Sequence, residues 1–596
     1  MKAGRRASVR ALLLAAFVAV GAAFTLAQSS AARLAPHPAA TLRVGLWTLW
    51  HDKEVTAGPM TEAGANLRVC GGCAPAPVTR PTEIRASASG LILAGNRQAA
   101  SVWLNGPVAL TAHGETLTLR NPVRITARNG ALVLAVTLPV ESYVERVVAS
   151  ESGSGDTPES LKALAIVVRS FALHQPHGHA DFDLCDSTHC QLLHWAGNGG
   201  KLSAAHAATL TTAGETLWFH GQRAQAWFHQ NCGGRTASPS EVWAVTAQGH
   251  EPPGKAMPWL GSHADSWCTT GGAREWSASI SQFDLSAALA AAGLARPGWK
   301  TLTVARRGKS GRAVTLLLDS AEISAEEFRL AVGRSLGWNQ ILSTWFEVSR
   351  QGDQFLFHGR GSGHGVGLCQ AGAAAMAFAG RDSSQILAQY FSGAVAADEA
   401  TGQSWQTQRR QGFLLETLDP ASSAYLPQLS RALAEAESRF GLQAAGLITV
   451  RAFPSTSAFR DATLAPGWVA AFTEGNWIAT QPLATLAARK LLVPILRHEF
   501  LHSLVESRAA ANTPLWLREG LVEAWSGDLK ATGTAPTLPL NEIDRALARA
   551  SGEARSQAAH RAAGWYAARL MERFGRVQVL AWLHEGVPSS ALAALQ

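Results

Sequence analysis

Two histidines near the C-terminal end of the chain have the spacing of a metal site. His498 and His502 stand four residues apart in the motif His-Glu-Phe-Leu-His, inside an apolar run of helical period. Positions i and i+4 share one face of a helix, so both imidazoles can bind one Zn²⁺. Glu499 would lie beside the open metal position, where a carboxylate can deprotonate a bound water molecule. The motif predicts a catalytic zinc site, the alternative being a helix with incidental histidines.

A third zinc ligand is expected from a second helical segment, PLWLREGLVEAWSG. Glu519 in this segment supplies the further oxygen donor, and Glu523, one turn later, is expected to hold a ligand imidazole through its outer N–H. These motifs resemble the gluzincin branch of the zinc metallopeptidases over residues 413–596. The resemblance implies that His498, His502 and Glu519 bind zinc, that Glu499 is the general base, and that the substrate is a peptide or protein. Tyr566 and His560 are candidates by residue type alone for stabilising the oxyanion.

A second group of metal-binding side chains lies in the first half of the chain, in HGHADFDLCDSTHCQ. Two thiolates with one or two imidazoles can close a structural tetrahedral zinc site. The group contains Cys185, Cys190, His179 and His189. A disulfide between Cys185 and Cys190 is the alternative in an oxidising compartment.

Four ordered segments in residues 41–395 carry a family resemblance. They are PVESYVERVVASESGSGDTPESLKALAIVVRSFAL, DLCDSTHCQ, WFHQNCGGRTAS and HGRGSGHGVGLCQAGA. Together they resemble the SpoIID/LytB family, whose active members are peptidoglycan lytic transglycosylases. Such an enzyme needs one carboxyl group, which protonates the leaving oxygen and then takes a proton from the C6 hydroxyl. The family's catalytic glutamate corresponds to Glu151 here, although Ser152 replaces the methionine that usually follows it.

The same resemblance assigns further roles. It implies zinc ligands at Cys185, Cys190 and His179, with His189 as the fourth candidate. It also places His364, in the glycine-dense loop 358–368, at the glycan cleft, where a buried structural imidazole is the alternative. LytB-like relatives resemble modulators of amidases, so a glycan-binding domain that presents a cell-wall amidase is the competing function.

Sequence context also predicts the states of the remaining cysteines and of two acidic residues. Cys70 and Cys73 are expected to form a small disulfide loop and Cys232 with Cys268 a second bridge, while Cys369 is expected to be an inert free thiol. Glu141 and Glu145 share a helix with Glu151 and are expected to be solvated.

The elements that must position these groups follow from periodicity. Residues 41–139 alternate in short runs separated by turn signals and predict antiparallel strands, whereas 140–151 and 160–174 have helical period. Thr157 or Asp156 is expected to cap the second helix. Residues 396–412 show no periodicity and are expected to link the domains. The predicted fold class is α+β and multidomain, with a β-rich N-terminal part, helical catalytic segments and a C-terminal mixed α/β zincin-like domain.

The first residues predict export. A basic start and the apolar stretch 11–27 are typical of a secretory signal peptide over residues 1–27, a retained anchor being the alternative. The formal charge is +8, and four of these charges belong to basic residues of the leader. Since no basic stripe with interleaved aromatic residues is present, nucleic acid is not expected as a partner. The protein is therefore expected in the cell envelope or outside the cell, acting on peptidoglycan.

Overall fold

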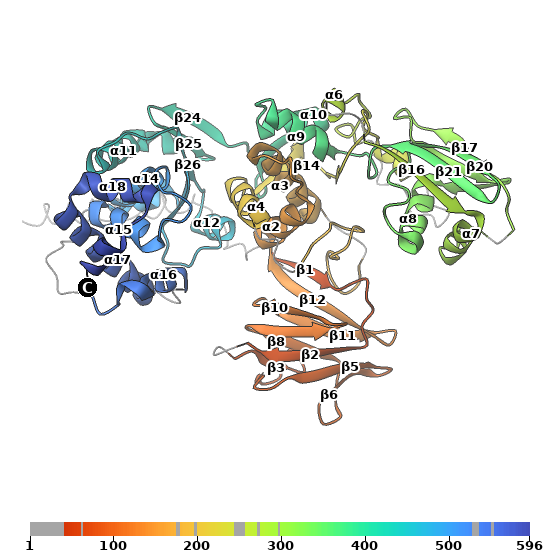
Figure 1. Cartoon of the computed structure of the whole chain (residues 1–596), viewed down its shortest axis with the longest axis horizontal. Helices are drawn as coiled ribbons and strands as arrows, with labels where there is room; N and C mark the ends of the chain where they lie inside the picture. Colours follow the sequence, from red (N-terminus) through yellow and green to blue (C-terminus); the bar gives the residue numbers. More distant parts are fainter. Residues whose placement is uncertain are drawn as a thin grey trace, which may run out of the picture. The chain divides into compact units, whose positions relative to one another are not determined.

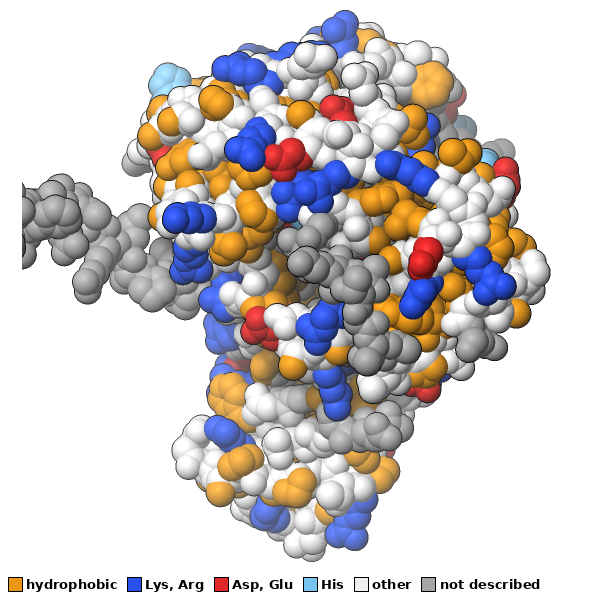
Figure 2. Space-filling view, turned by 90° about the vertical axis from the view of Figure 1, so that its left-hand side faces the viewer, with side chains coloured by type: hydrophobic (Ala, Val, Ile, Leu, Met, Phe, Trp, Pro, Cys, Tyr) orange, Lys and Arg blue, Asp and Glu red, His pale blue; other side chains and the backbone are white. Residues whose placement is uncertain are grey.

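The computed structural model describes residues 41–60, 64–174, 179–195, 200–243, 257–270, 274–295, 298–526, 536–549 and 553–595. The predicted signal peptide over 1–27 lies outside these ranges. In the part of the chain described, no helix is both long and apolar enough to span a bilayer. On the face drawn in Figure 2, Lys and Arg side chains are scattered among apolar and uncharged ones rather than gathered in a stripe.

Residues 41–139 form two six-stranded antiparallel sheets. Their orders are β1-β12-β11-β8-β3-β4 and β10-β9-β2-β5-β6-β7. The strands are β1 (Thr41–Leu46), β2 (Glu54–Pro59), β3 (Asn66–Arg68), β4 (Ala76–Pro77), β5 (Thr82–Ser87), β6 (Gly90–Leu93), β7 (Arg97–Ala99), β8 (Ser101–Asn105), β9 (Val108–Ala112), β10 (Glu115–Leu119), β11 (Val123–Arg128) and β12 (Ala131–Pro139). The alternating side chains of both sheets are buried in one core, which confirms the period-2 prediction. Strand β12 leads directly into the first helix (Figure 1).

Three helices follow the strands: α2 (Val140–Glu151), α3 (Pro158–Leu173) and α4 (Gly200–Thr211). Helix α3 begins as predicted, since Thr157 is the N-cap in a capping box and a proline occupies the first turn. Around the helices lie α5 (Pro239–Val242), α6 (Ser266–Thr269), α9 (Gln370–Phe378), α10 (Ser383–Tyr390), the sheet of β13 (Glu215–Phe219), β14 (Gln222–Arg223) and β23 (Val395–Asp398), and the parallel pair β15 (Phe228–His229) and β22 (Leu368–Cys369).

The prediction that Glu141 is solvated was wrong. Glu141 is 7% exposed and accepts two hydrogen bonds from the guanidinium of Arg169, which is fully buried on α3. The cause is that Arg169 lies on a helix with every face covered, where a guanidinium needs a carboxylate partner. Glu145, by contrast, pairs at the surface with His206, 3.1 Å away.

Residues 275–360 form a separate α/β unit with its own apolar core. It consists of β16 (Glu275–Ser281), α7 (Gln282–Ala291), β17 (Leu302–Arg307), β18 (Ala313–Leu318), β19 (Ala321–Ser324), α8 (Ala325–Leu336), β20 (Phe346–Gln351) and β21 (Gln354–Arg360). Its strands form two three-stranded sheets, β16-β21-β20 and β17-β18-β19. The region that was predicted as one domain, 41–395, therefore contains the strand-rich unit, the helical unit and this inserted unit.

The C-terminal part is a five-stranded sheet covered by helices. The sheet order is β24-β25-β26-β28-β27, with β25, β26 and β28 parallel. Figure 1 shows α11, α14, α15 and α17 packed together beside the strands. The elements are β24 (Gln406–Arg410), β25 (Phe413–Thr417), η1 (Pro420–Tyr425), α11 (Leu426–Phe440), β26 (Ile448–Ala452), α12 (Thr456–Thr463), β27 (Ala471–Glu474), β28 (Trp477–Thr480), α13 (Leu483–Ala488), α14 (Leu492–Glu506), α15 (Leu515–Ser526), α16 (Leu540–Arg549), α17 (Glu553–Phe574), α18 (Arg576–Glu585) and α19 (Ser589–Ala593).

The structure adds detail to two predicted segments. The segment 396–412, expected to link the domains, includes part of β23, which pairs with β13, and all of β24, which pairs with β25. The apolar run that contains the His-Glu-Phe-Leu-His motif, predicted as helical, is not one helix but is divided between α13 and α14. Pro494 explains the interruption, since its ring would clash with the carbonyl of Lys490 in a continuous helix and is tolerated only in a first turn.

Candidate active sites

Glu151 is the last residue of α2, where the chain leaves the helix. Its Oε1 accepts a hydrogen bond from the backbone N–H of Leu192 at 3.3 Å, and its backbone oxygen accepts one from the side-chain amide of Gln370 at 3.0 Å. Burial raises the pKa of Glu151 to about 7, although the Leu192 hydrogen bond works in the opposite direction. A carboxyl group with such a pKa holds its proton about half of the time at neutral pH, as an acid that later acts as a base requires.

The loop 185–195 holds Leu192 against α2. Tyr143, fully buried on α2, donates from its hydroxyl to the side chain of Gln191 at 2.9 Å. The backbone N–H of His194 donates to the Ser150 hydroxyl at 2.8 Å. The donor to Glu151 therefore belongs to a loop that is attached to the same helix on both sides of Leu192.

Four metal-binding side chains converge at the start of this loop. The ligand atoms of His179, Cys185, His189 and Cys190 all lie within 4.8 Å of one another. His179 Nε2 is 3.2 Å from the Cys190 sulfur, and His189 Nδ1 is 3.8 Å from the Cys185 sulfur. Both thiols are free, and a hydrogen bond with Cys190 lowers the pKa of Cys185. The geometry thus brings together all four predicted donors, including His189, in a set that fits a tetrahedral ion.

His364 is engaged by the protein itself. Its Nδ1 accepts a hydrogen bond from the N–H of Val366 at 3.1 Å, and its ring lies against Trp243 at a centroid distance of 5.3 Å. The glycines of the loop serve chain packing rather than close approach of a ligand: Gly367 has φ +75°, and an added Cβ would overlap the carbonyl of Trp227. The predicted contact between His364 and glycan stays a prediction.

The C-terminal motif residues meet between α14 and α15. His498 Nε2 and His502 Nε2 are 3.1 Å apart on one face of α14, and Glu519 Oε2 on α15 lies 3.7 Å from His502 Nε2. Burial lowers the pKa of both histidines to about 4, which keeps them neutral as metal binding requires. Glu519 Oε2 is buried without a hydrogen-bond donor. A buried carboxylate oxygen without a hydrogen-bond donor, 3.7 Å from a neutral imidazole, is a donor pair that a divalent cation fits.

Glu499 lies on the sheet side of α14. Its Oε2 accepts a hydrogen bond from the Thr473 hydroxyl on β27 at 2.6 Å, and burial raises its pKa to about 7. Strand β27 is the last in the sheet order and packs against α14. The candidate base therefore stands next to an edge strand.

Glu523 contacts a residue other than the one expected. The prediction paired it with a ligand imidazole, but its Oε1 is 3.3 Å from Nδ1 of His560 on α17, which is also 3.4 Å from Glu519 Oε2. His560 belongs to the site because α17 packs on α15, a long-range contact that local periodicity does not encode. The ring of Tyr566 instead packs on Trp565.

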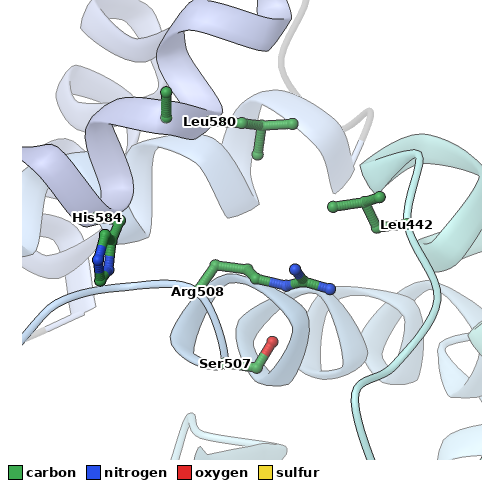
Figure 3. A pocket seen from close by; sticks show the side chains of 6 residues that line it. Leu442, Ser507, Arg508, Leu580 and His584 are labelled. Atoms are coloured by element: carbon green, nitrogen blue, oxygen red, sulfur yellow. The ribbon is translucent and has the colours of Figure 1, made fainter.

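A hollow on the same domain lies apart from these side chains. It is bordered by Leu442, Ser507, Arg508, Leu580, Ala581 and His584, at the C-terminal end of α14 (Figure 3). None of its lining residues is a candidate ligand or base.

The other cysteines confirm two expectations and correct one. Cys70 and Cys73 form the predicted disulfide. Cys232 and Cys268 are not bonded to each other, and both are buried free thiols. Cys369 is a buried free thiol, as expected, and its sulfur lies beside both of them. Folding brings the three thiols together from separate segments.

Comparison with known proteins supports the first half of the sequence-based assignment. A family model described as "Stage II sporulation protein" (SpoIID) matches residues 128–219, and one described as "Domain of unknown function (DUF8618)" matches residues 266–367. The first match includes α2, α3 and α4. The second match covers the inserted α/β unit. Neither match reaches residues 413–596.

Curated relatives agree with this result. An uncharacterised protein of Brachyspira hyodysenteriae is 27% identical over 273 residues, which are 45% of this chain and 70% of the relative. Stage II sporulation protein D of Bacillus subtilis is 27% identical over 302 residues, 46% of this chain and 78% of the relative. The Bacillus amyloliquefaciens protein of the same name is 24% identical over 305 residues, 48% of this chain and 81% of the relative.

Proposed function

We propose that this chain is an exported cell-wall enzyme whose SpoIID domain cleaves peptidoglycan glycan in the manner of a lytic transglycosylase. The observation that carries the proposal is Glu151, a partly buried carboxyl group with a pKa near 7 at the end of α2. The similarity to stage II sporulation protein D and the SpoIID match over the same helix support the substrate class. Residues 1–27 would direct export.

Glu151 would act first as an acid and then as a base. In its protonated form it donates to the glycosidic oxygen, the bond to C1 of the muramic acid breaks, and the ring develops oxocarbenium character. The resulting carboxylate then removes the proton of the C6 hydroxyl while that oxygen bonds to C1. The products are a 1,6-anhydro end and a free hydroxyl, and no water is consumed. One carboxyl group is enough, in contrast to the pair that hydrolysis requires.

The cluster of His179, Cys185, His189 and Cys190 would hold a structural Zn²⁺ in this scheme. Its role would be to fix the loop that carries Leu192, because a closed tetrahedral site contributes folding free energy rather than chemistry. Leu192 in turn orients the Glu151 carboxyl group.

Anhydromuropeptide formation tests the glycan half. Wild type is expected to release 1,6-anhydromuropeptides from purified peptidoglycan, and Glu151→Gln is expected to release none. Glu145→Gln, on the same helix but paired at the surface, is the matched control. Equal yields from wild type and Glu151→Gln contradict the assignment. Glycan binding by both proteins without turnover by either would instead favour a glycan-binding domain that presents a cell-wall amidase.

For residues 413–596 we propose a zinc-dependent peptidase. His498, His502 and Glu519 would hold the ion, which when bound polarises a water molecule and the scissile carbonyl. Glu499 would take the proton from the attacking water and pass it to the leaving amine. Thr473 holds the Glu499 carboxylate, and the edge strand β27 offers backbone groups with which an extended peptide can pair.

Peptide cleavage and metal content test this half together. Glu499→Gln is expected to abolish cleavage of a casein or peptide substrate and to keep its zinc, whereas His502→Ala is expected to lose both. Glu585→Gln, an exposed carboxyl on α18, serves as the control. Cleavage that persists in Glu499→Gln would show that another group is responsible.

A further inference from the structure

Three cysteines and an aspartate from separate segments meet in the apolar core that also contains α2 and α3. Cys232 follows β15, Cys369 ends β22, and Cys268 lies in α6. Asp265 is the N-cap of α6, where its Oδ1 accepts the N–H of Cys268 at 3.2 Å. The three sulfurs and one carboxylate oxygen all lie within 4.8 Å of one another.

The geometry of this group is that of a tetrahedral metal site. Cys232 Sγ is 3.2 Å from Asp265 Oδ2, and the Cys369 sulfur accepts the N–H of Cys232 at 3.2 Å. Sulfurs bound to one Zn²⁺ at 2.3 Å stand about 3.8 Å apart, so small shifts bring these four donors onto one ion. The backbone N–H groups of Gly233 and Gly234 donate hydrogen bonds to the Cys268 sulfur. Metal-bound thiolates are held by backbone N–H groups in the same way.

Burial argues for a cation. Cys232, Cys369 and Asp265 are fully enclosed and Cys268 is 5% exposed. A carboxylate surrounded by three thiols is costly to bury without positive charge. Arg312 donates to the backbone oxygen of Cys232 at 3.0 Å. Among the described residues, the hydrogen bonds to the Asp265 carboxylate come from neutral groups, namely the Cys232 thiol, the Cys268 N–H and the Tyr390 hydroxyl at 2.9 Å.

We propose that Cys232, Cys268, Cys369 and Asp265 form a second structural zinc site in this core, distinct from the cluster around Cys185. Thiolate ligands in a closed tetrahedral arrangement select Zn²⁺ among the common divalent ions. No open position remains, because all four donors belong to the protein, so the ion would stabilise the fold and not react.

The position of the site gives it a role beside Glu151. It joins β15, α6 and the end of the glycine-dense loop, and Gln370, the residue after Cys369, donates to the backbone oxygen of Glu151. The cluster around Cys185 fixes the loop that carries Leu192, whose backbone N–H donates to the side chain of Glu151. This positioning role rests on the proposed function of Glu151, whereas the metal site itself does not.

Metal analysis of the full chain, purified with a mild reductant, tests the site. Wild type is expected to carry about one zinc per chain more than Cys369→Ser. Tyr390→Phe removes a neighbour of Asp265 without removing a ligand and is expected to keep the full content. Equal zinc in wild type and Cys369→Ser, or a Cys232–Cys268 disulfide mapped by mass spectrometry under non-reducing conditions, overturns the proposal.

A second measurement does not depend on the folding of Cys369→Ser. In a Cys185→Ser/Cys190→Ser variant loaded with Co²⁺, a thiolate-to-cobalt charge-transfer band must arise from the remaining cysteines, because the site at His498 has no sulfur ligand. Presence of the band supports the site and its absence contradicts it. Neither result depends on glycan cleavage. A failure of the metal-site proposal can therefore be told apart from a failure of the catalytic role proposed for Glu151.

Discussion

Replacement of Glu151 by glutamine is expected to change how the stability of the protein depends on pH. The carboxyl group has an ordinary pKa of 4.5 and a folded-state pKa of about 7, raised mainly by burial. One pKa unit corresponds to about 1.4 kcal/mol, so the ionised form is disfavoured in the fold by about 3 kcal/mol. Glutamine keeps an oxygen for the Leu192 N–H but does not ionise.

The direction follows from proton binding. Below pH 4.5 the carboxyl group is protonated in both folded and unfolded chains and contributes nothing to the pH dependence. Between pH 4.5 and 7 the unfolded chain has lost the proton while the folded chain keeps it, so stability falls as pH rises. Above pH 7 both forms are ionised, and wild type has lost the full amount, about 3 kcal/mol, relative to Glu151→Gln.

Urea unfolding of wild type and Glu151→Gln at matched pH values from 4 to 8 measures this difference. Subtraction at each pH removes the contributions of all other groups, and the transition that includes α2 is the one compared. Glu115→Gln, at an exposed carboxyl group on β10, is expected to show no such trend. A difference that stays constant from pH 4 to 8, or that changes in the opposite direction, refutes the burial of Glu151 as the origin of its pKa.

Three further outcomes are expected. Glu141→Gln leaves Arg169 buried without its carboxylate and should cost about 3 to 5 kcal/mol in urea unfolding, with partial recovery on adding Arg169→Met; a loss below about 1 kcal/mol contradicts the buried pair. Gly367→Ala places a Cβ against a carbonyl at positive φ and should cost at least about 2 kcal/mol, seen as a lower melting temperature. Thr473→Val should lower peptidase kcat about 10- to 100-fold while zinc content is unchanged, because Glu499 loses its orienting hydroxyl; unchanged kcat removes Thr473 from the site.

Local signals predicted the elements that carry the candidate sites. The apolar period of residues 140–151 defined α2 with both ends correct, and Thr157 caps α3 as expected, because helix period and capping depend on residues within one or two turns. One failure of local prediction has an equally local cause. Pro494 interrupts an apolar run whose periodicity continues through it.

Long-range packing decided what lies beside these elements. His560 joins Glu519 and Glu523 only because α17 packs on α15. Arg169 reaches Glu141 across two helices. In each case the partner side chains are separated by more residues than any periodic pattern covers.

The sequence by itself determined the chemistry available to this protein: a helix-end glutamate, a His-Glu-x-x-His helix and a Cys/His-rich loop. All three are set by spacings of a few residues, which helix and loop geometry convert directly into shared faces. Only the tertiary structure decided that Cys232, Cys268 and Cys369 meet around Asp265. The physical reason is that these residues come together by burying three distant segments in one core, and the free energy for that comes from the whole core rather than from the residues themselves.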